Sequence, residues 1–224
     1  MNNSTLSSIQ RRMAQNIPLG RSDESTIRRL WWAALETLQE DILLPMNLQK
    51  GLWLSAPLPA LHEPSLLQRL KGWVWGPSQL ATLNYLDSGL LLPSNKKLFH
   101  QNDNYETRRY KHLKLHEKDG HDPLLIILTS KIQLALTLYG PPNQRNLIIK
   151  TDQESLRDIL TILNLRLNQD DSQEAKELYQ EISMLKLSDN CNLEKLFWPL
   201  LSSRLANMAP SITLQTLPNN NNHE

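Results

Sequence analysis

A run of closely spaced strand patterns at residues 122–167 constrains the fold of this 224-residue chain more than any other segment. Asp122-Pro123 precedes a continuous apolar run at Leu124–Leu128, and residues 132–139 then alternate between two faces. A Gly-Pro-Pro-Asn turn leads to a third apolar run at 146–150, and a helical pattern follows at once. Connections this short allow only antiparallel neighbours, because a parallel return needs a crossover of about a dozen residues or more. The segment therefore predicts an antiparallel meander that leads into a helix.

The first half of the chain alternates between helical and strand patterns. Capping residues at 22–25 precede an amphipathic helix that runs to Ile42 and is ended by Pro45. The polar side of this helix, which includes Gln39, is predicted to face solvent. Short strands are predicted at Gly51–Leu54 and Gly72–Trp75, short helices at 64–70 and 77–86, and a long polar loop at 92–122 with an edge strand in its KHLKL segment.

These patterns predict an α+β fold with a central, mostly antiparallel sheet of about five strands, flanked by helices and followed by a helical C-terminal extension. Thr151 is predicted to cap the helix that follows the meander. Pro199 is expected to kink or split the last helix, which favours two C-terminal helices folded back on each other. The predicted organisation is a flexible arm at 1–21, an α+β domain at 22–167, a helical extension at 168–209 and a disordered tail at 210–224.

Composition indicates a globular cytoplasmic protein. Hydrophobic residues make up 40% and charged residues 21% of the chain, which is ordinary for a globular domain. A formal charge of +1 gives no global reason to expect nucleic acid as a partner. The single cysteine fits a reducing compartment, and no apolar run approaches the roughly 20 residues that span a bilayer.

Two sets of apolar residues are candidates for binding. The chain has six tryptophans and only two phenylalanines, and tryptophan fills cores but also lines ligand pockets. Core filling is favoured, and Trp53, Trp73 and Trp75 are the candidates for a ligand pocket against the sheet. The second set comprises apolar residues of the helical extension, predicted either to cover the domain or to bind a partner or second subunit: Leu178, Ile182, Leu185, Phe197 and Leu201.

Polar clusters are weaker candidates for chemistry. His112 and His116 have the spacing of metal ligands on a helix, but their segment resembles a strand and is rich in lysine and arginine, so no metal site is predicted. The basic segment 108–114 could bind phosphate or nucleic acid, but acidic residues on both sides of it weaken the positive field, so a solvated loop is predicted. Phosphate-binding, nucleophile-elbow and zinc-protease motifs are absent, so no catalytic residue is assigned and no cofactor is named.

Four segments carry a resemblance to a known family: GLWLSAPLPAL at 51–61, GWVWGPSQL at 72–80, DPLLIILTSKIQLALTLYG at 122–140 and NLIIKTDQESL at 146–156. Their order resembles the DICT sensory domain of diguanylate cyclases and two-component systems. It is closer to related input domains at the N-terminus of some cyanobacterial sensor histidine kinases. In those domains an Asp-Pro precedes two apolar strands and an Asp ends the third, as Asp122-Pro123 and Asp152 do here.

This resemblance covers about residues 27–167 and implies a sensor or adaptor module that stands alone, since no kinase core follows. We therefore expect a non-enzymatic signal-input or regulatory module in the cytoplasm that acts through protein–protein interaction, with a small ligand as an option. An assembly or scaffold factor without a ligand is the alternative. An enzyme built from scattered residues is the third hypothesis.

Overall fold

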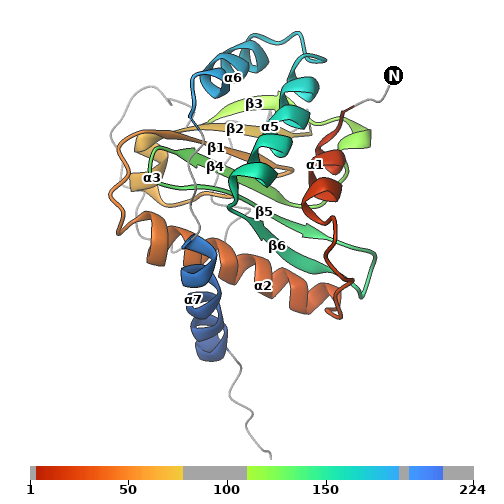
Figure 1. Cartoon of the computed structure of the whole chain (residues 1–224), viewed down its shortest axis with the longest axis vertical. Helices are drawn as coiled ribbons and strands as arrows, with labels where there is room; N and C mark the ends of the chain where they lie inside the picture. Colours follow the sequence, from red (N-terminus) through yellow and green to blue (C-terminus); the bar gives the residue numbers. More distant parts are fainter. Residues whose placement is uncertain (1–3, 78–109, 187–191, 209–224) are drawn as a thin grey trace, which may run out of the picture.

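A six-stranded sheet with helices on both faces organises the chain in the computed structural model, which describes residues 4–77, 110–186 and 192–208 (Figure 1). The strands are β1 (Gly51–Ala56), β2 (Leu70–Gly76), β3 (Lys111–Lys114), β4 (Leu124–Thr129), β5 (Gln133–Tyr139) and β6 (Asn146–Lys150). The helices are α1 (Leu6–Met13), α2 (Glu24–Glu36), the π-helix η1 (Thr37–Leu43), α3 (Pro64–Arg69), the 3₁₀ helix η2 (Glu117–Asp119), α5 (Gln153–Leu167), α6 (Gln173–Ser183) and α7 (Leu193–Met208).

The sheet is mixed and has the order β3-β2-β1-β4-β5-β6. Strands β4, β5 and β6 pair antiparallel, which confirms the predicted meander. Strands β1 and β2 pair parallel, because α3 lies between them along the chain and returns it to the same end of the sheet. Strand β3 is added parallel at the outer edge, so the KHLKL segment is an edge strand as predicted. The observed α+β fold thus confirms the predicted class, with six strands instead of five.

The two faces of the sheet bury separate apolar clusters. Successive side chains of a strand point to opposite faces, so Trp53 and its neighbours Leu52 and Leu54 belong to different clusters. One face, called here the α2 face, is covered by α2, η1, α3 and α7. The other, called the α5 face, is covered by α1, α5 and α6. Figure 1 shows α1 and α5 beside each other over this second face.

Helix starts follow local capping chemistry. The side chain of Asp23 accepts a hydrogen bond from the Thr26 amide at the start of α2, as the sequence predicts. Helix α5 begins one residue later than predicted, because Asp152 and not Thr151 caps it by accepting from the Ser155 amide at 2.8 Å. Thr151 is buried directly after the end of β6.

The N-terminal segment is not a flexible arm throughout, which corrects the prediction for residues 1–21. Helix α1 buries Leu6, Ile9 and Met13 on the α5 face. Polar residues dominate this segment and obscure its short amphipathic pattern, although these three apolar residues recur at helical spacing.

The C-terminal helices also differ from the prediction. Helix α6 packs on the α5 face and α7 on the α2 face, so they do not fold back on each other. Helix α7 continues from Leu193 to Met208 with Pro199 inside it, so the proline does not split the helix. The predicted helix at 77–86, most of the loop at 92–122 and the predicted tail at 210–224 lie outside the described residues.

Candidate functional site

The three candidate tryptophans do not converge on one pocket. Trp53 lies on the α2 face, whereas Trp73 and Trp75 lie on the α5 face. All three side chains are fully buried, and Trp53 makes an edge contact with Tyr110 at 6.0 Å between ring centroids. The Trp73 indole donates to the Glu174 carbonyl at 3.2 Å and so ties β2 to α6. These positions fit core filling, which the composition favoured.

The predicted partner-binding residues lie inside the core of the chain. Leu178 and Ile182 of α6 pack on the α5 face, and Phe197 and Leu201 of α7 pack on the α2 face. Leu185 is half-buried beside the α5-face cluster. Of the two predicted roles, covering the domain is the one that these contacts match. A partner would have to bind other side chains.

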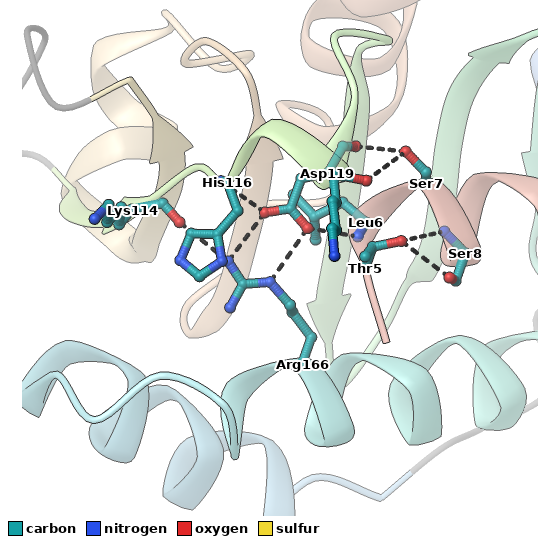
Figure 2. A network of polar contacts seen from close by, with 9 residues as sticks. Thr5, Leu6, Ser7, Ser8, Lys114, His116, Asp119 and Arg166 are labelled. Carbon is teal, nitrogen blue, oxygen red and sulfur yellow. Dashed lines mark hydrogen bonds and ion pairs between the residues drawn. The ribbon is translucent and has the colours of Figure 1, made fainter. Parts of the chain in front are cut away.

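A buried ion pair between Asp119 and Arg166 is the most concentrated polar feature of the described residues (Figure 2). Arg166 Nη2 donates to Asp119 Oδ2 at 3.0 Å and Nε donates to Oδ1 at 3.2 Å. The Nη2 group also donates to the Lys114 carbonyl at 3.1 Å. The side chains are 1% and 0% exposed, so the pair is shielded from water.

Helix α1 is attached to the same carboxylate. The Leu6 amide at the start of α1 donates to Asp119 Oδ1 at 3.0 Å, and the His116 amide donates to Oδ2 at 2.9 Å. Ser7 Oγ donates to the Asp119 carbonyl at 2.7 Å (Figure 2). Asp119 thereby joins α1, the loop after β3 and α5.

These contacts decide what Asp119 can do chemically. Burial raises the pKa of Asp119, but hydrogen bonds from Arg166, Leu6 and His116 lower it more, so the net pKa is below the ordinary value. Both carboxylate oxygens already accept two hydrogen bonds each. A carboxylate that is ionised and already accepts four hydrogen bonds is suited to holding elements together and not to proton transfer.

Sequence reasoning missed this pair, although one signal was available. Arg166 falls in the buried stripe of α5, between Leu163 and Leu167. A charged residue on an apolar face needs a buried partner. Its partner comes from η2, 47 residues earlier, which only the fold brings near.

A second buried polar contact is made by Gln39 in η1. Its Oε1 accepts from the amides of His62 and Glu63 at 2.9 and 3.1 Å, and its Nε2 donates to the Leu35 carbonyl at 3.2 Å. The prediction that Gln39 faces solvent is therefore wrong. A π-helix has i→i+5 bonds, as from the Leu44 amide to the Gln39 carbonyl, so the spacing of an ordinary helix no longer applies after Glu36.

An open surface hollow of about 510 Å³ lies between α1 and the end of β5. Its lining includes Arg11, Arg12 and Tyr139. Arg12 is already paired with Asp158 of α5, so the hollow presents little unpaired charge at this side chain. None of the three candidate tryptophans lines it.

The outward surface of α7 exposes two large apolar side chains and carries little charge. Trp198 and Leu196 are 40% and 46% exposed, although both are large apolar side chains. The single arginine of α7, Arg204, turns toward α2 and η1, where it pairs with Glu36, Glu40 and Asp41 at 2.8–3.3 Å. We call seven of the exposed residues the outer face of α7: Lys195, Leu196, Trp198, Pro199, Ser202, Ser203 and Ala206. Asn207 and Met208, at the end of the helix, are exposed as well.

Among the described residues there is no helix long and apolar enough to cross a membrane, and there is no group of three or more potential metal ligands. Comparison with known proteins adds a family. Residues 7–210 match a family described as a Domain of unknown function (DUF8628). The chain belongs to this family. The DUF8628 domain here begins within α1 and ends beyond α7, so both helices are integral parts of it. Curated proteins and solved structures give no match to the chain.

Proposed function

We propose that this DUF8628 protein is a non-enzymatic regulatory module that acts by binding a protein partner through the outer face of α7. The observation that carries the proposal is the exposure of Trp198 and Leu196 on a surface helix whose single arginine is turned inward. Exposed aromatic and aliphatic side chains with little charge around them are typical of the centre of protein interfaces.

Two observations support a binding role over a catalytic one. The Asp119 carboxylate is engaged by four donors, and the Gln39 amide is likewise committed to backbone groups. These buried polar groups stabilise the fold, and within the described residues they do not involve the outer face of α7.

Signal input in the cytoplasm is the more specific form of the proposal. Its support is the resemblance of the strand order to DICT-type input domains, together with the single cysteine of the chain. The scaffold alternative is supported by the three tryptophans, which fill the core on two faces and so provide no ligand pocket between them.

Purification of the tagged protein from its own host, followed by native mass spectrometry, tests the proposal. The wild type should retain a partner in fixed stoichiometry, and Trp198→Ser should lose it. Tyr179→Ser is the matched control, because Tyr179 is an aromatic residue of α6 that is 41% exposed, against 40% for Trp198. The purified partner should then bind the wild type and the control equally.

The outcomes separate the alternatives. A small molecule retained together with the partner favours signal input, whereas a partner without a small molecule favours the scaffold. Equal retention by Trp198→Ser and the wild type would contradict a binding role for this surface.

A further inference from the structure

We propose that the surface hollow between α1 and the end of β5 binds a small organic phosphate, a phosphate monoester that carries a flat apolar group. Its volume of about 510 Å³ lies in the range of roughly 300–1,000 Å³ that is typical of small-molecule sites. The hollow is built on α1, which covers the α5 face, whereas α7 covers the α2 face. A ligand site at this place goes beyond the proposed function and does not depend on partner binding by α7.

The lining of the hollow offers basic, neutral polar and apolar side chains and no acidic one. It consists of Ser8, Arg11, Arg12, Ala14, Gln15 and Tyr139. Arg11 supplies the charge, because the residue is exposed and makes no ion pair or hydrogen bond with any other described residue. An unpaired guanidinium in the wall of a hollow attracts an anion, and its planar N–H groups match the oxygens of a phosphate.

Arg12 is already held in place by its neighbours. Its Nε donates to Asp158 Oδ2 at 2.9 Å, and its Nη2 donates to the same oxygen. Its Nη1 donates to Gln15 Oε1. The Asp158 carboxylate balances the charge of Arg12, so the excess positive charge at the hollow is that of Arg11. Because Arg12 is ordered before a ligand arrives, binding costs little further side-chain entropy at this residue.

The Gln15 carboxamide is oriented by the same contact. Its Oε1 accepts from Arg12, so its Nε2 group points away from Arg12 and presents N–H donors for which no described residue is an acceptor. Ser8 differs, because its Oγ is already bonded to Thr5 Oγ1 at 3.0 Å. Donors therefore exceed free acceptors in the hollow, which favours an anion over a cation.

Tyr139 and Ala14 supply the apolar part of the lining, and both are partly buried against the α5-face cluster. An aromatic ring can stack on a flat group, and the phenol hydroxyl can donate to a phosphate oxygen. Donors together with an aromatic ring fit an ester better than inorganic phosphate. Because the hollow is open to solvent, which screens charge, we expect a dissociation constant on the order of 0.1–1 mM for phenyl phosphate.

Titration of phenyl phosphate into the ¹⁵N-labelled full-length chain, followed by NMR, tests the site. The Arg11 side-chain Nε–H and the Gln15 carboxamide signals should shift and saturate. Phenol, which is neutral, should leave the Arg11 signal unchanged. Absence of saturable shifts at Arg11 up to about 10 mM phenyl phosphate, or equal shifts at arginines elsewhere on the surface, would overturn the inference.

Two further probes test the ligand class. Inorganic phosphate should shift the same signals with an affinity at least about 5-fold weaker than that of phenyl phosphate, because it makes no contact with the Tyr139 ring. Equal affinity would mean an adventitious ion only and would overturn the ester. Benzoate should also bind more weakly, because a carboxylate has fewer oxygens for the donors. Benzoate that binds as tightly as phenyl phosphate would overturn the assignment of a phosphate.

A charge-removing variant tests the role of Arg11. Arg11→Gln should raise the dissociation constant for phenyl phosphate at least about 10-fold, because the excess positive charge is lost. Arg29→Gln is the matched control, since Arg29 is exposed on α2 and likewise makes no ion pair with a described residue. The control should bind as the wild type does. An unchanged affinity in Arg11→Gln would overturn the site.

Failure of this site can be told from failure of the proposed function. If phenyl phosphate does not bind while Trp198→Ser loses a protein partner, only the ligand site is wrong. If phenyl phosphate binds while Trp198→Ser retains every partner of the wild type, only the binding role of α7 is wrong.

Discussion

Asp119 and Arg166 illustrate how this chain accommodates charge in its core. Transferring both ions from water costs several kcal/mol each, which their mutual attraction offsets only with good geometry and further hydrogen bonds. Here the further bonds come from the Leu6 and His116 amides and the Lys114 carbonyl. Among the described residues only Arg166 Nη1 of this pair has no partner. The pair therefore holds α1, the segment from Lys114 to Asp119 and α5 together, and these bonds also offset much of the cost of burying the two charges.

Removing one charge of the pair should be costly. Asp119→Asn leaves the Arg166 guanidinium buried without a counter-ion, and we expect a loss of about 3 kcal/mol in the free energy of unfolding. Urea denaturation would measure it, with the exposed Asp171→Asn as control. A loss no larger than in the control would show that the guanidinium reaches water.

A double-mutant cycle of Asp119→Asn and Arg166→Met measures the coupling between the two side chains. Each single substitution leaves the other charged side chain buried without its partner, whereas the double variant removes both charges. The double variant should therefore lose less stability than the sum of the single losses. Additive losses would mean that the two side chains do not interact in the folded protein.

The pH dependence of stability follows from the lowered pKa of Asp119. A carboxyl whose pKa is lower in the folded than in the unfolded state stabilises the fold above the unfolded value, and this contribution is lost as the pH falls through the folded value. The ordinary value is 3.8, so the loss should begin near that pH and continue below it. The difference in unfolding free energy between the wild type and Asp119→Asn should accordingly shrink as the pH is lowered from 7 to 3. A constant difference would show that Asp119 is not responsible.

At the scale of single elements, the junction of α2 with the π-helix η1 is the most unusual feature. The wide turn of this π-helix directs Gln39 inward. There its side chain accepts hydrogen bonds from the amides of His62 and Glu63, just before α3. The carboxamide thereby fixes the two residues that precede α3. It does not cap the helix itself, and the side chain of the N-cap residue Glu63 makes no capping bond either.

Gln39→Ala should test this connection. The substitution leaves the His62 and Glu63 amides without an acceptor, and we expect a loss of about 2 kcal/mol in unfolding free energy. Hydrogen exchange should become faster at these two amides while the amides of the sheet strands remain protected. Arg29→Ala, an exposed substitution on α2, is the control. Unchanged exchange rates would indicate that other groups accept these two hydrogen bonds.

At the scale of the whole molecule, the two C-terminal helices cover opposite faces of one sheet. Leu178 of α6 and Phe197 of α7 are each fully buried, in different clusters. The helical extension is therefore part of the folded domain and does not form a separate module. The family match, which ends beyond α7, agrees with this extent.

A chain that ends at Gln169 should fail to fold stably, since both faces of the sheet lose a covering helix. The milder variants Leu178→Ala and Phe197→Ala should each cost about 2–5 kcal/mol, because each leaves a cavity in a packed cluster. Their losses should add, since the sheet separates the two sites. Urea denaturation and the dispersion of amide resonances would measure both effects. A truncated chain as stable as the full one would show that the helices are dispensable.

Local patterns in the sequence were sufficient for much of the architecture. The short turns at 130–132 and around Gly140 require an antiparallel meander, Asp23 caps α2, and the buried stripe of α5 follows directly from its helical spacing. These features depend on interactions between residues near each other in the chain. Periodicity and capping report such interactions directly.

Contacts between distant segments were decided only by the tertiary structure. The partner of Arg166, the inward turn of Gln39, and the opposite faces chosen by α6 and α7 all depend on residues far apart in the chain. An amphipathic pattern indicates that a helix buries one side, but it does not identify the residues on which that side packs. For that reason the sequence by itself predicted that Phe197 and Leu201 are apolar contacts. It was the packed sheet that turned them inward and left Trp198 and Leu196 outside.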